Sequence, residues 1–225
     1  MIGMADGLRL RSGYFHDRAA FQALADLLRE TFGIDIGQLD RLGGPDPSAV
    51  PFGYFDEAGR CVANFSAFSM PLLVGDRVVR AAGYQSGAVR PEYRGRGLYR
   101  DLMRRAFGWA EAAGFELGIL LTDKPALYEP YGFRVVEQHV FHGPAPEKTP
   151  AKECHSLSIA DDKDVLLMRS LLAERVPVSN RFAVAGHSRE FLLKACFDPA
   201  IRLSHLRQDR HRHQMVQKSV DGHRC

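Results

Sequence analysis

The sequence is poor in cysteine and in metal-ligand patterns. Its 225 residues include four cysteines, and no two of them form a Cys-x-x-Cys pair. This distribution argues against a disulfide framework and against a zinc site built from cysteine. The histidine-containing stretches 16–18 and 210–213 have no spaced carboxylate or cysteine set beside them. We therefore predict that the protein binds no metal.

Long apolar runs and a strong charge imbalance are also missing. No run of 18 apolar residues occurs, and the first residues, MIGMADGLRLRSGYF, lack the apolar core of a signal peptide. The formal net charge is +3, which is too small to indicate a nucleic-acid partner by itself. These features predict a soluble, cytoplasmic protein with no membrane partner and no nucleic-acid partner.

The spacing of apolar residues predicts an α/β (α+β) domain over the first two-thirds of the chain. Amphipathic helices alternate with strands, and the apolar run FELGILL, residues 115–121, is typical of a strand buried on both faces. A central mixed sheet with helices on both faces follows from this order. The expected elements are a strand over 8–14, a helix over 17–33, a weak helix over 34–42, a strand meander over 51–89, a helix over 98–114, a strand over 115–121, a short helix or turn over 124–132 and a strand over 133–143.

The rest of the chain has a different composition. The proline- and lysine-rich stretch 143–153 indicates a linker or surface loop, which separates a first domain, 1–145, from a partial helical C-terminal region, 146–208. That region could belong to an incomplete second domain. The tail, 209–225, has few apolar residues and no periodicity, so we expect it to be disordered. Within 146–208 the patterns predict helices over 159–176 and 188–197 and a strand over 201–208.

Arginine and glycine gather directly before the predicted helix that follows the meander, in VRPEYRGRGLYRDLMRRA, residues 89–106. A helix N-terminus leaves backbone N–H groups unpaired and carries about half a positive charge, so it can bind an anion. Gly95 and Gly97 lack the side chains that would block a phosphate, and Arg94 and Arg96 add charge-assisted contacts. These residues predict a pyrophosphate site at this strand-to-helix turn.

Two common phosphate motifs do not fit the stretch. A P-loop needs GxxxxGK[ST], and neither Lys-Ser nor Lys-Thr follows these glycines. A dinucleotide-binding fingerprint needs a third glycine near the place where Arg100 stands, and a parallel βαβ unit in place of the meander. A solvated helix start is the alternative that needs no ligand.

The segment PEYRGRGL, residues 91–98, resembles the acetyl-CoA signature Gln/Arg-x-x-Gly-x-Gly/Ala of the GNAT superfamily of N-acetyltransferases. The chain matches both glycines and the arginine before the first, and has Glu92 where glutamine or arginine is usual. Downstream, LYEPYGF, residues 127–133, resembles the family segment LY-x-x-[FY]-G-[FY]. Together the matches cover about 8–143. The resemblance implies a mostly antiparallel GNAT-like sheet, acetyl-CoA as co-substrate and an amine acceptor.

The resemblance also assigns roles to residues around the junction. In this family the strand before the loop and the strand after the helix splay apart, and the pantetheine arm pairs with the exposed strand edge. A backbone N–H of that edge polarises the thioester carbonyl. The predicted cofactor-binding residues are Gly87, Ala88, Val89, Arg94, Gly95, Arg96, Gly97, Leu98 and Tyr99.

Tyr128, the first tyrosine of the downstream segment, is the general acid that the resemblance implies. A phenol of pKa about 10 stays protonated at neutral pH and can protonate a leaving thiolate of pKa about 8.5. A packed core tyrosine with a satisfied hydroxyl is the alternative. The base that deprotonates the amine is not assigned. The candidates are Glu57, Asp123, Glu129 and a water chain held by Tyr84, Gln85 or Ser86.

We expect an N-acetyltransferase that acts on a primary amine of a small molecule or peptide, by direct attack in a ternary complex. A non-catalytic acetyl-CoA-binding sensor and a nucleic-acid-binding domain built on the arginine cluster are the alternatives. The acceptor pocket would be formed by 33–55 and 133–145, where Asp35, Asp40 and Asp46 could attract a cation or merely be solvated. A homo-oligomer is possible. The order of one GNAT unit, a linker and helices is similar to the enhanced-intracellular-survival group of acetyltransferases.

Overall fold

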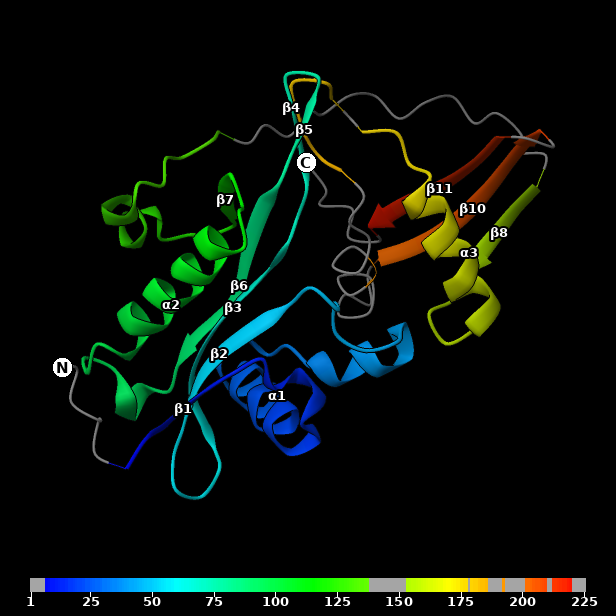
Figure 1. Ribbon diagram of the computed structural model, residues 1–225. Coiled ribbons are helices and arrows are strands. Elements are labelled where there is room, and N and C mark those ends of the chain that lie inside the picture. The colour runs from blue at the N-terminus through cyan, green and yellow to red at the C-terminus, as the bar shows by residue number, and fades with distance from the viewer. Residues whose placement is uncertain are drawn as a thin grey trace, which may run out of the picture.

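The computed structural model describes residues 7–137, 153–177, 179–185, 192, 201–209 and 212–219. Five strands form the central sheet, in the order β1-β2-β3-β6-β7 (Figure 1). Neighbouring strands are antiparallel except β6 and β7, which run parallel. The mixed, mostly antiparallel sheet predicted from the sequence is confirmed. The helices and strands of this unit are β1 (Arg9–Ser12), α1 (Arg18–Phe32), β2 (Val50–Phe55), β3 (Cys61–Ser69), β4 (Leu72–Val74), β5 (Arg77–Val79), β6 (Ala81–Val89), α2 (Leu98–Ala112) and β7 (Leu117–Leu120).

Short 3₁₀ helices connect these elements. η1 is Tyr14–His16, η2 is Ile36–Leu42, η3 is Pro91–Tyr93, η4 is Pro125–Leu127 and η5 is Glu129–Tyr131. The segment predicted as a short helix or turn over 124–132 therefore contains η4 and η5. The strand predicted over 133–143 has no counterpart in 133–137, and its other residues lie outside the described part of the chain.

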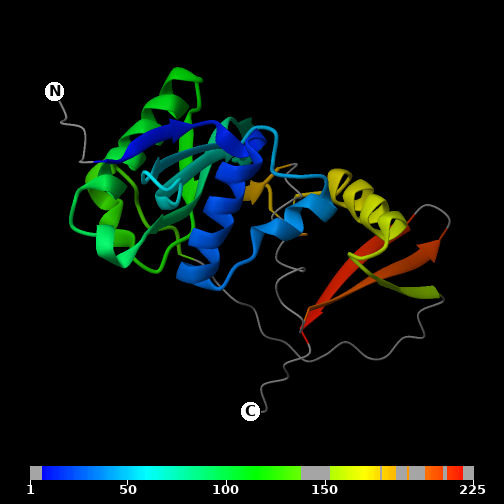
Figure 2. The same ribbon diagram turned by 90° about the horizontal axis from the view of Figure 1, so that it is seen from below.

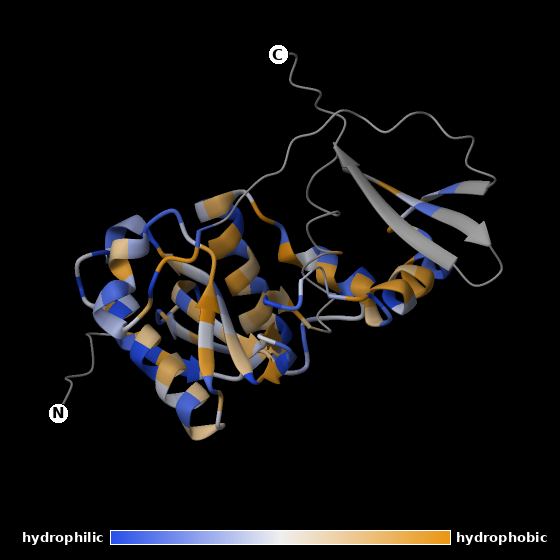
Figure 3. Ribbon diagram, turned by 90° about the horizontal axis from the view of Figure 1, so that it is seen from above, coloured by the Kyte–Doolittle hydropathy of each residue, from blue (hydrophilic) through white to orange (hydrophobic). Residues whose placement is uncertain are grey.

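The two long helices cover opposite faces of the sheet (Figure 2). α1 begins after Asp17, whose carboxylate accepts hydrogen bonds from the N–H groups of Ala19 and Ala20 at 3.0 and 3.1 Å, and it ends at the left-handed Gly33. Leucines at helical spacing, including Leu24 and Leu28, face the sheet and are buried. Hydrophobic and hydrophilic residues accordingly alternate along the helices in Figure 3.

β7 is more exposed than its sequence predicts. The side of β7 away from β6 has no strand partner among the residues described here, Leu117 is 44% exposed and Leu121, just after the strand, is 83% exposed. The expectation of a strand buried on both faces is wrong for this part of the structure. An apolar run shows only that a strand could be buried on both faces. Whether it is buried depends on segments that are distant in the sequence.

The C-terminal residues contain more strand than the sequence predicts. β8, β10 and β11 form an antiparallel sheet beside the helix α3, and β9 pairs with β4 in a second small sheet. Leu42 of η2 also packs in one cluster with Val165 and Met168 of α3. Among the residues that the structure describes, the C-terminal part thus contacts the first unit at β4 and at η2. The bounds are β8 (Glu153–Leu157), α3 (Asp162–Ala173), β9 (Phe182–Val184), β10 (Ile201–Asp209) and β11 (Arg212–Ser219).

The tail differs from its prediction. Residues 209–225 are expected to be disordered, yet Arg212–Ser219 form β11, which pairs with β10. Backbone pairing with a neighbouring strand overrides the weak local preference of this sequence. The predicted linker over 143–153 lies outside the described residues except at Glu153, and the helix predicted over 188–197 is described only at Leu192.

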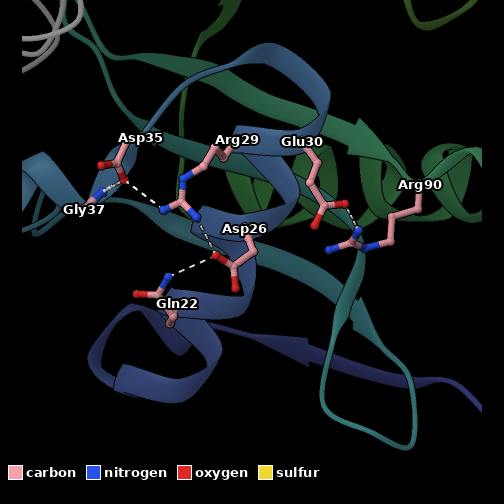
Figure 4. Close-up of polar contacts among 7 residues, drawn as sticks. All are labelled: Gln22, Asp26, Arg29, Glu30, Asp35, Gly37 and Arg90. Carbon is pink, nitrogen blue, oxygen red and sulfur yellow. Dashed lines mark hydrogen bonds and ion pairs between the residues drawn. The ribbon is translucent and has the colours of Figure 1, made fainter.

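An ion pair joins α1 to the end of β6. The Arg90 side chain is 7% exposed, donates from Nε to the Cys61 carbonyl at 2.9 Å, and pairs through its guanidinium with Glu30 of α1 (Figure 4). Asp26 on the same helix forms exposed contacts instead, with Gln22 and Arg29 at 3.0 and 2.9 Å. Arg90 is therefore a structural residue that fixes the segment between β6 and the arginine–glycine loop.

We expect Glu30→Gln to lower the free energy of unfolding by about 1–3 kcal/mol, because it leaves the buried Arg90 guanidinium without a carboxylate. Asp26→Asn, the matched change on the same helix, should cost less than about 1 kcal/mol. Urea unfolding of both variants at neutral pH measures the difference. Equal losses would contradict this role of Arg90.

Candidate active site

The loop before α2 leaves the helix N-terminus open. Gly95 and Gly97 have φ of 77° and 76°, a left-handed conformation that favours glycine, and a Cβ added to either would meet no atom within 4 Å. Gly97 is also the N-cap of α2, and no side chain caps the helix there. The start of α2 thus has no side-chain cap and has open space at both glycines, as binding of an anion at this turn requires.

The arginines of the loop are exposed and make few contacts. Arg94 Nε donates to the Val89 carbonyl at 3.2 Å, and the Arg96 guanidinium lies over the Tyr93 ring, 4.9 Å from its centroid. Arg105, further along α2, pairs with Asp101 at 2.6 Å. Arg94 and Arg96 therefore keep most of their hydrogen-bonding capacity for a ligand, whereas Arg90 and Arg105 are engaged within the protein.

β6 has an unpaired edge beside this loop. Its pairing with β7 runs from Ala81 opposite Leu117 to Tyr84 opposite Leu120 and then stops. In the part of the chain that the structure describes, residues 85–89 have no strand partner on that side, although they continue to pair with β3 on the other. This unpaired stretch contains Gly87, Ala88 and Val89, the residues that the sequence predicts for pantetheine binding.

A β-bulge interrupts β6 in the same stretch. Asn64 faces Ala88 and Ser66 faces Gln85, so two residues of β6 lie opposite Phe65 alone. The first of these, Ser86, has a φ of 58°, which is uncommon for a residue with a side chain. The bulge changes the course of the β6 backbone directly before Ala88 and Val89, which are predicted to bind acetyl-CoA.

A buried amide holds the bulge in place. The Asn64 side chain is fully buried; its Nδ2 donates to the Ser86 carbonyl at 2.9 Å and to Ser66 Oγ at 3.0 Å. Its Oδ1 accepts from the Tyr14 hydroxyl at 2.6 Å. Every hydrogen-bonding atom of the amide has a partner, so the network specifies one backbone conformation at Ser86.

Two tyrosine hydroxyls meet next to the bulge. Tyr128, which follows η4 and is 8% exposed, shares a 2.7 Å hydrogen bond with the hydroxyl of Tyr99 from the first turn of α2. A Cβ at Gly87 would overlap the Tyr99 hydroxyl, which places the tyrosine pair against the unpaired edge of β6. The structure thus brings Tyr128, Tyr99 and Gly87 together.

The candidate bases are spread over several elements. Glu57 is exposed in the turn between β2 and β3, Asp123 is exposed after β7, and Glu129 is exposed beside Tyr128 in η5. Tyr84 lies in the core, where burial raises its pKa to about 12. Gln85 is half-buried at the start of the unpaired edge. The assignment of a base stays open.

Two of the three candidate acceptor-binding aspartates stabilise local turns. Asp35 caps η2. Its carboxylate accepts hydrogen bonds from the Gly37 N–H, which has the larger effect, and from Arg29 at 3.2 Å, and these lower the pKa of Asp35 below its usual value (Figure 4). Asp46 accepts from the Ser48 N–H at 2.7 Å. Asp40 is exposed. Local hydrogen bonds thus account for Asp35 and Asp46 without a bound amine.

The chain also matches a known family. The model of the acetyltransferase (GNAT) domain matches residues 18–136, which is more than half of the chain. The chain belongs to the GNAT acetyltransferase family. This confirms the resemblance drawn from the two motifs, and members of the family use acetyl-CoA.

Individual members of the GNAT family share limited sequence identity with this chain. An uncharacterized N-acetyltransferase of Streptomyces griseus is 35% identical over 95 residues, which cover 42% of this chain and 22% of that protein. The probable N-acyltransferase of Enterococcus faecalis aligns with a TM-score of 0.62 at 14% identity, over 93% of this chain and 54% of that one. Eis1 of Mycobacterium abscessus aligns with a TM-score of 0.56 at 14% identity, over 94% and 58%. The chain thus spans little more than half of these two structures, which share its fold.

Sequence reasoning missed the side chains that organise this GNAT site. Asn64 stands in the buried run CVANFSAF, where an amide among apolar residues is the available signal. Tyr99 was assigned to the backbone cradle, whereas its hydroxyl bonds Tyr128. The described residues contain no cluster of three metal-ligating side chains and no helix long and apolar enough to cross a membrane.

We expect Asn64→Leu to destabilise the protein by about 2–4 kcal/mol, because the Tyr14 hydroxyl and the Ser86 carbonyl both lose a buried partner. Ser66→Ala removes another contact of the same amide and should cost about 1 kcal/mol. Chemical unfolding of both variants checks the order. A loss for Asn64→Leu no larger than that for Ser66→Ala would show that the amide does not hold the bulge.

Proposed function

We propose that the protein transfers an acetyl group from acetyl-CoA to a primary amine of a small molecule or peptide. The observation that carries this proposal is the position of the tyrosine pair. The Tyr99 hydroxyl, which bonds the Tyr128 hydroxyl, lies against Gly87, on the β6 edge that is left unpaired beside the uncapped start of α2. A phosphate site, a strand edge and a proton donor are the parts that acetyl transfer from a thioester of coenzyme A needs.

Two groups of residues in the chain suit two parts of the acetyl-CoA molecule. The open N–H groups at the start of α2, with Arg94 and Arg96, suit the pyrophosphate. The N–H and C=O groups of Gly87–Val89 suit an extended pantetheine arm, which would add to β6 as a further strand does. An N–H in that stretch would polarise the thioester carbonyl.

The chemistry assigned to the protein is alignment and proton transfer. The amine nitrogen forms the new N–C bond with its lone pair as the C–S bond breaks. The electron pair of the C–S bond goes to sulfur. Tyr128 would give that sulfur a proton, since a phenol is protonated at neutral pH. Holding both substrates in line supplies much of the rate in such a reaction.

A regulatory module that binds acetyl-CoA without turnover is the second candidate. Burial of Tyr128 and its satisfied hydroxyl suit a packing role as well as a catalytic one. A nucleic-acid-binding surface has less support, because Arg90 and Arg105 are already paired with Glu30 and Asp101. Turnover separates the first two candidates.

Acetyl-CoA should stabilise the protein in a thermal-shift titration, whereas ATP and NADH should not. At about a hundredfold excess over the dissociation constant, a specific ligand adds roughly 2.7 kcal/mol, or about 5–10 °C in Tm for a chain of this size. Gly97→Ala should lose most of this shift, because a left-handed alanine distorts the helix start and projects into the space before it.

Gly59→Ala is the matched control for this titration. Gly59 has a φ of 81°, and an added Cβ meets no atom within 4 Å, but it lies in the turn between β2 and β3. The control should lose similar stability and keep the acetyl-CoA shift. If acetyl-CoA leaves the Tm of the folded wild-type protein unchanged, the proposed function is wrong.

Tyr128→Phe should lower kcat at least about 100-fold while the acetyl-CoA shift in Tm persists, because the phenol acts after binding. Release of free coenzyme A thiol, measured with a polyamine, an aminoglycoside, an amino-acid amide and a lysine peptide, reports turnover. Tyr131→Phe is the control, because the Tyr131 ring packs edge-on against the Phe107 ring, with centroids 5.4 Å apart, and phenylalanine keeps this packing. Binding without thiol release in the wild-type protein would favour the regulatory module.

A further inference from the structure

Tyr99 is placed where a side chain can act on Tyr128. It is the second residue of α2, and its ring packs edge-on against Phe65 with centroids 5.5 Å apart. Its hydroxyl lies 2.7 Å from the Tyr128 hydroxyl and occupies space that a side chain at Gly87 would take. The helix, the ring contact and the missing side chain at Gly87 therefore all fix the position of this hydroxyl.

One hydrogen lies between the two phenol oxygens, so only one of them donates. Burial, followed by the hydrogen bond with Tyr128, raises the pKa of Tyr99 well above its usual value. Tyr99 therefore keeps its proton throughout the neutral range and can act as the donor. When it donates, the hydrogen of Tyr128 points away from Tyr99.

We propose that Tyr99 is a positioning residue that donates its hydroxyl hydrogen bond to the Tyr128 oxygen and so directs the Tyr128 proton toward the leaving thiolate. This rests on the proposed acetyltransferase function and adds to it a second tyrosine with a defined role. As Tyr128 gives up its proton, negative charge develops on the phenol oxygen. The Tyr99 O–H, already in place, stabilises that charge.

The proton balance of the step is complete without a further reactant. The Tyr128 proton goes to the thiolate sulfur as the C–S bond breaks, and the attacking nitrogen releases its own proton to solvent. Tyr128 then recovers a proton from solvent. Tyr99 keeps its proton throughout, which distinguishes a positioning residue from a relay.

Tyr99→Phe tests the proposal, because phenylalanine keeps the ring packing on Phe65 and removes only the hydroxyl. We expect kcat for thiol release to fall about 10- to 100-fold, the loss of one hydrogen bond to a developing charge, with the acetyl-CoA shift in Tm retained. In Tyr99→Phe/Tyr128→Phe, kcat should equal that of Tyr128→Phe alone.

Tyr54→Phe is the matched control. The Tyr54 hydroxyl also bonds to the first turn of α2, at Asp101 Oδ2 and 2.8 Å, so its loss costs a comparable contact away from Tyr128. The control should keep kcat. Full kcat in Tyr99→Phe, or losses that multiply in the double variant, would overturn the role of Tyr99. Failure of the proposed function itself has a different signature, namely no thiol release by the wild-type protein or full kcat in Tyr128→Phe.

Discussion

The site depends on the place where β6 and β7 stop pairing. Parallel neighbours share backbone hydrogen bonds as far as Tyr84 and Leu120, and β6 continues for five more residues with β3 as its partner on one side. Backbone N–H and C=O groups that are left over in this way need partners. Arg94 supplies one for the Val89 carbonyl. In the proposed function, the other groups of the edge serve as a template for an extended ligand, so that backbone alone would supply this part of the binding site.

The bulge at Ser86 interrupts regular pairing within that edge, and a buried polar network maintains it. An apolar residue at the position of Asn64 could pack as densely, but it would leave the backbone free to relax toward regular pairing. The amide instead requires the Ser86 carbonyl and the Tyr14 hydroxyl at fixed places. The protein thus accepts an uncommon φ at one residue beside the site, and the surrounding hydrogen bonds determine it completely.

Most of the first unit could be predicted because its signals are local. Apolar spacing and terminal glycines mark α1, turn residues mark the meander, and two short motifs mark the loop and Tyr128. The predictions that failed concern contacts between segments that are distant in the sequence. The exposure of Leu117 in β7 and the pairing of Arg212–Ser219 in β11 both depend on such contacts. The tyrosine pair belongs to the same class, since 29 residues separate its members and no periodicity links them.

In the proposed function, the first turn of α2 links acetyl-CoA binding to the proton donor. Its N-cap, Gly97, leaves the helix without a side-chain cap, and its second side chain, Tyr99, bonds Tyr128. Any ligand that orders this turn also orders the hydroxyl that bonds Tyr128. Gly87 completes the arrangement, because its missing side chain makes room for that hydroxyl next to the strand edge. In the proposed function, one helical turn and one glycine therefore connect the phosphate end of the site with the place where the thiolate would leave.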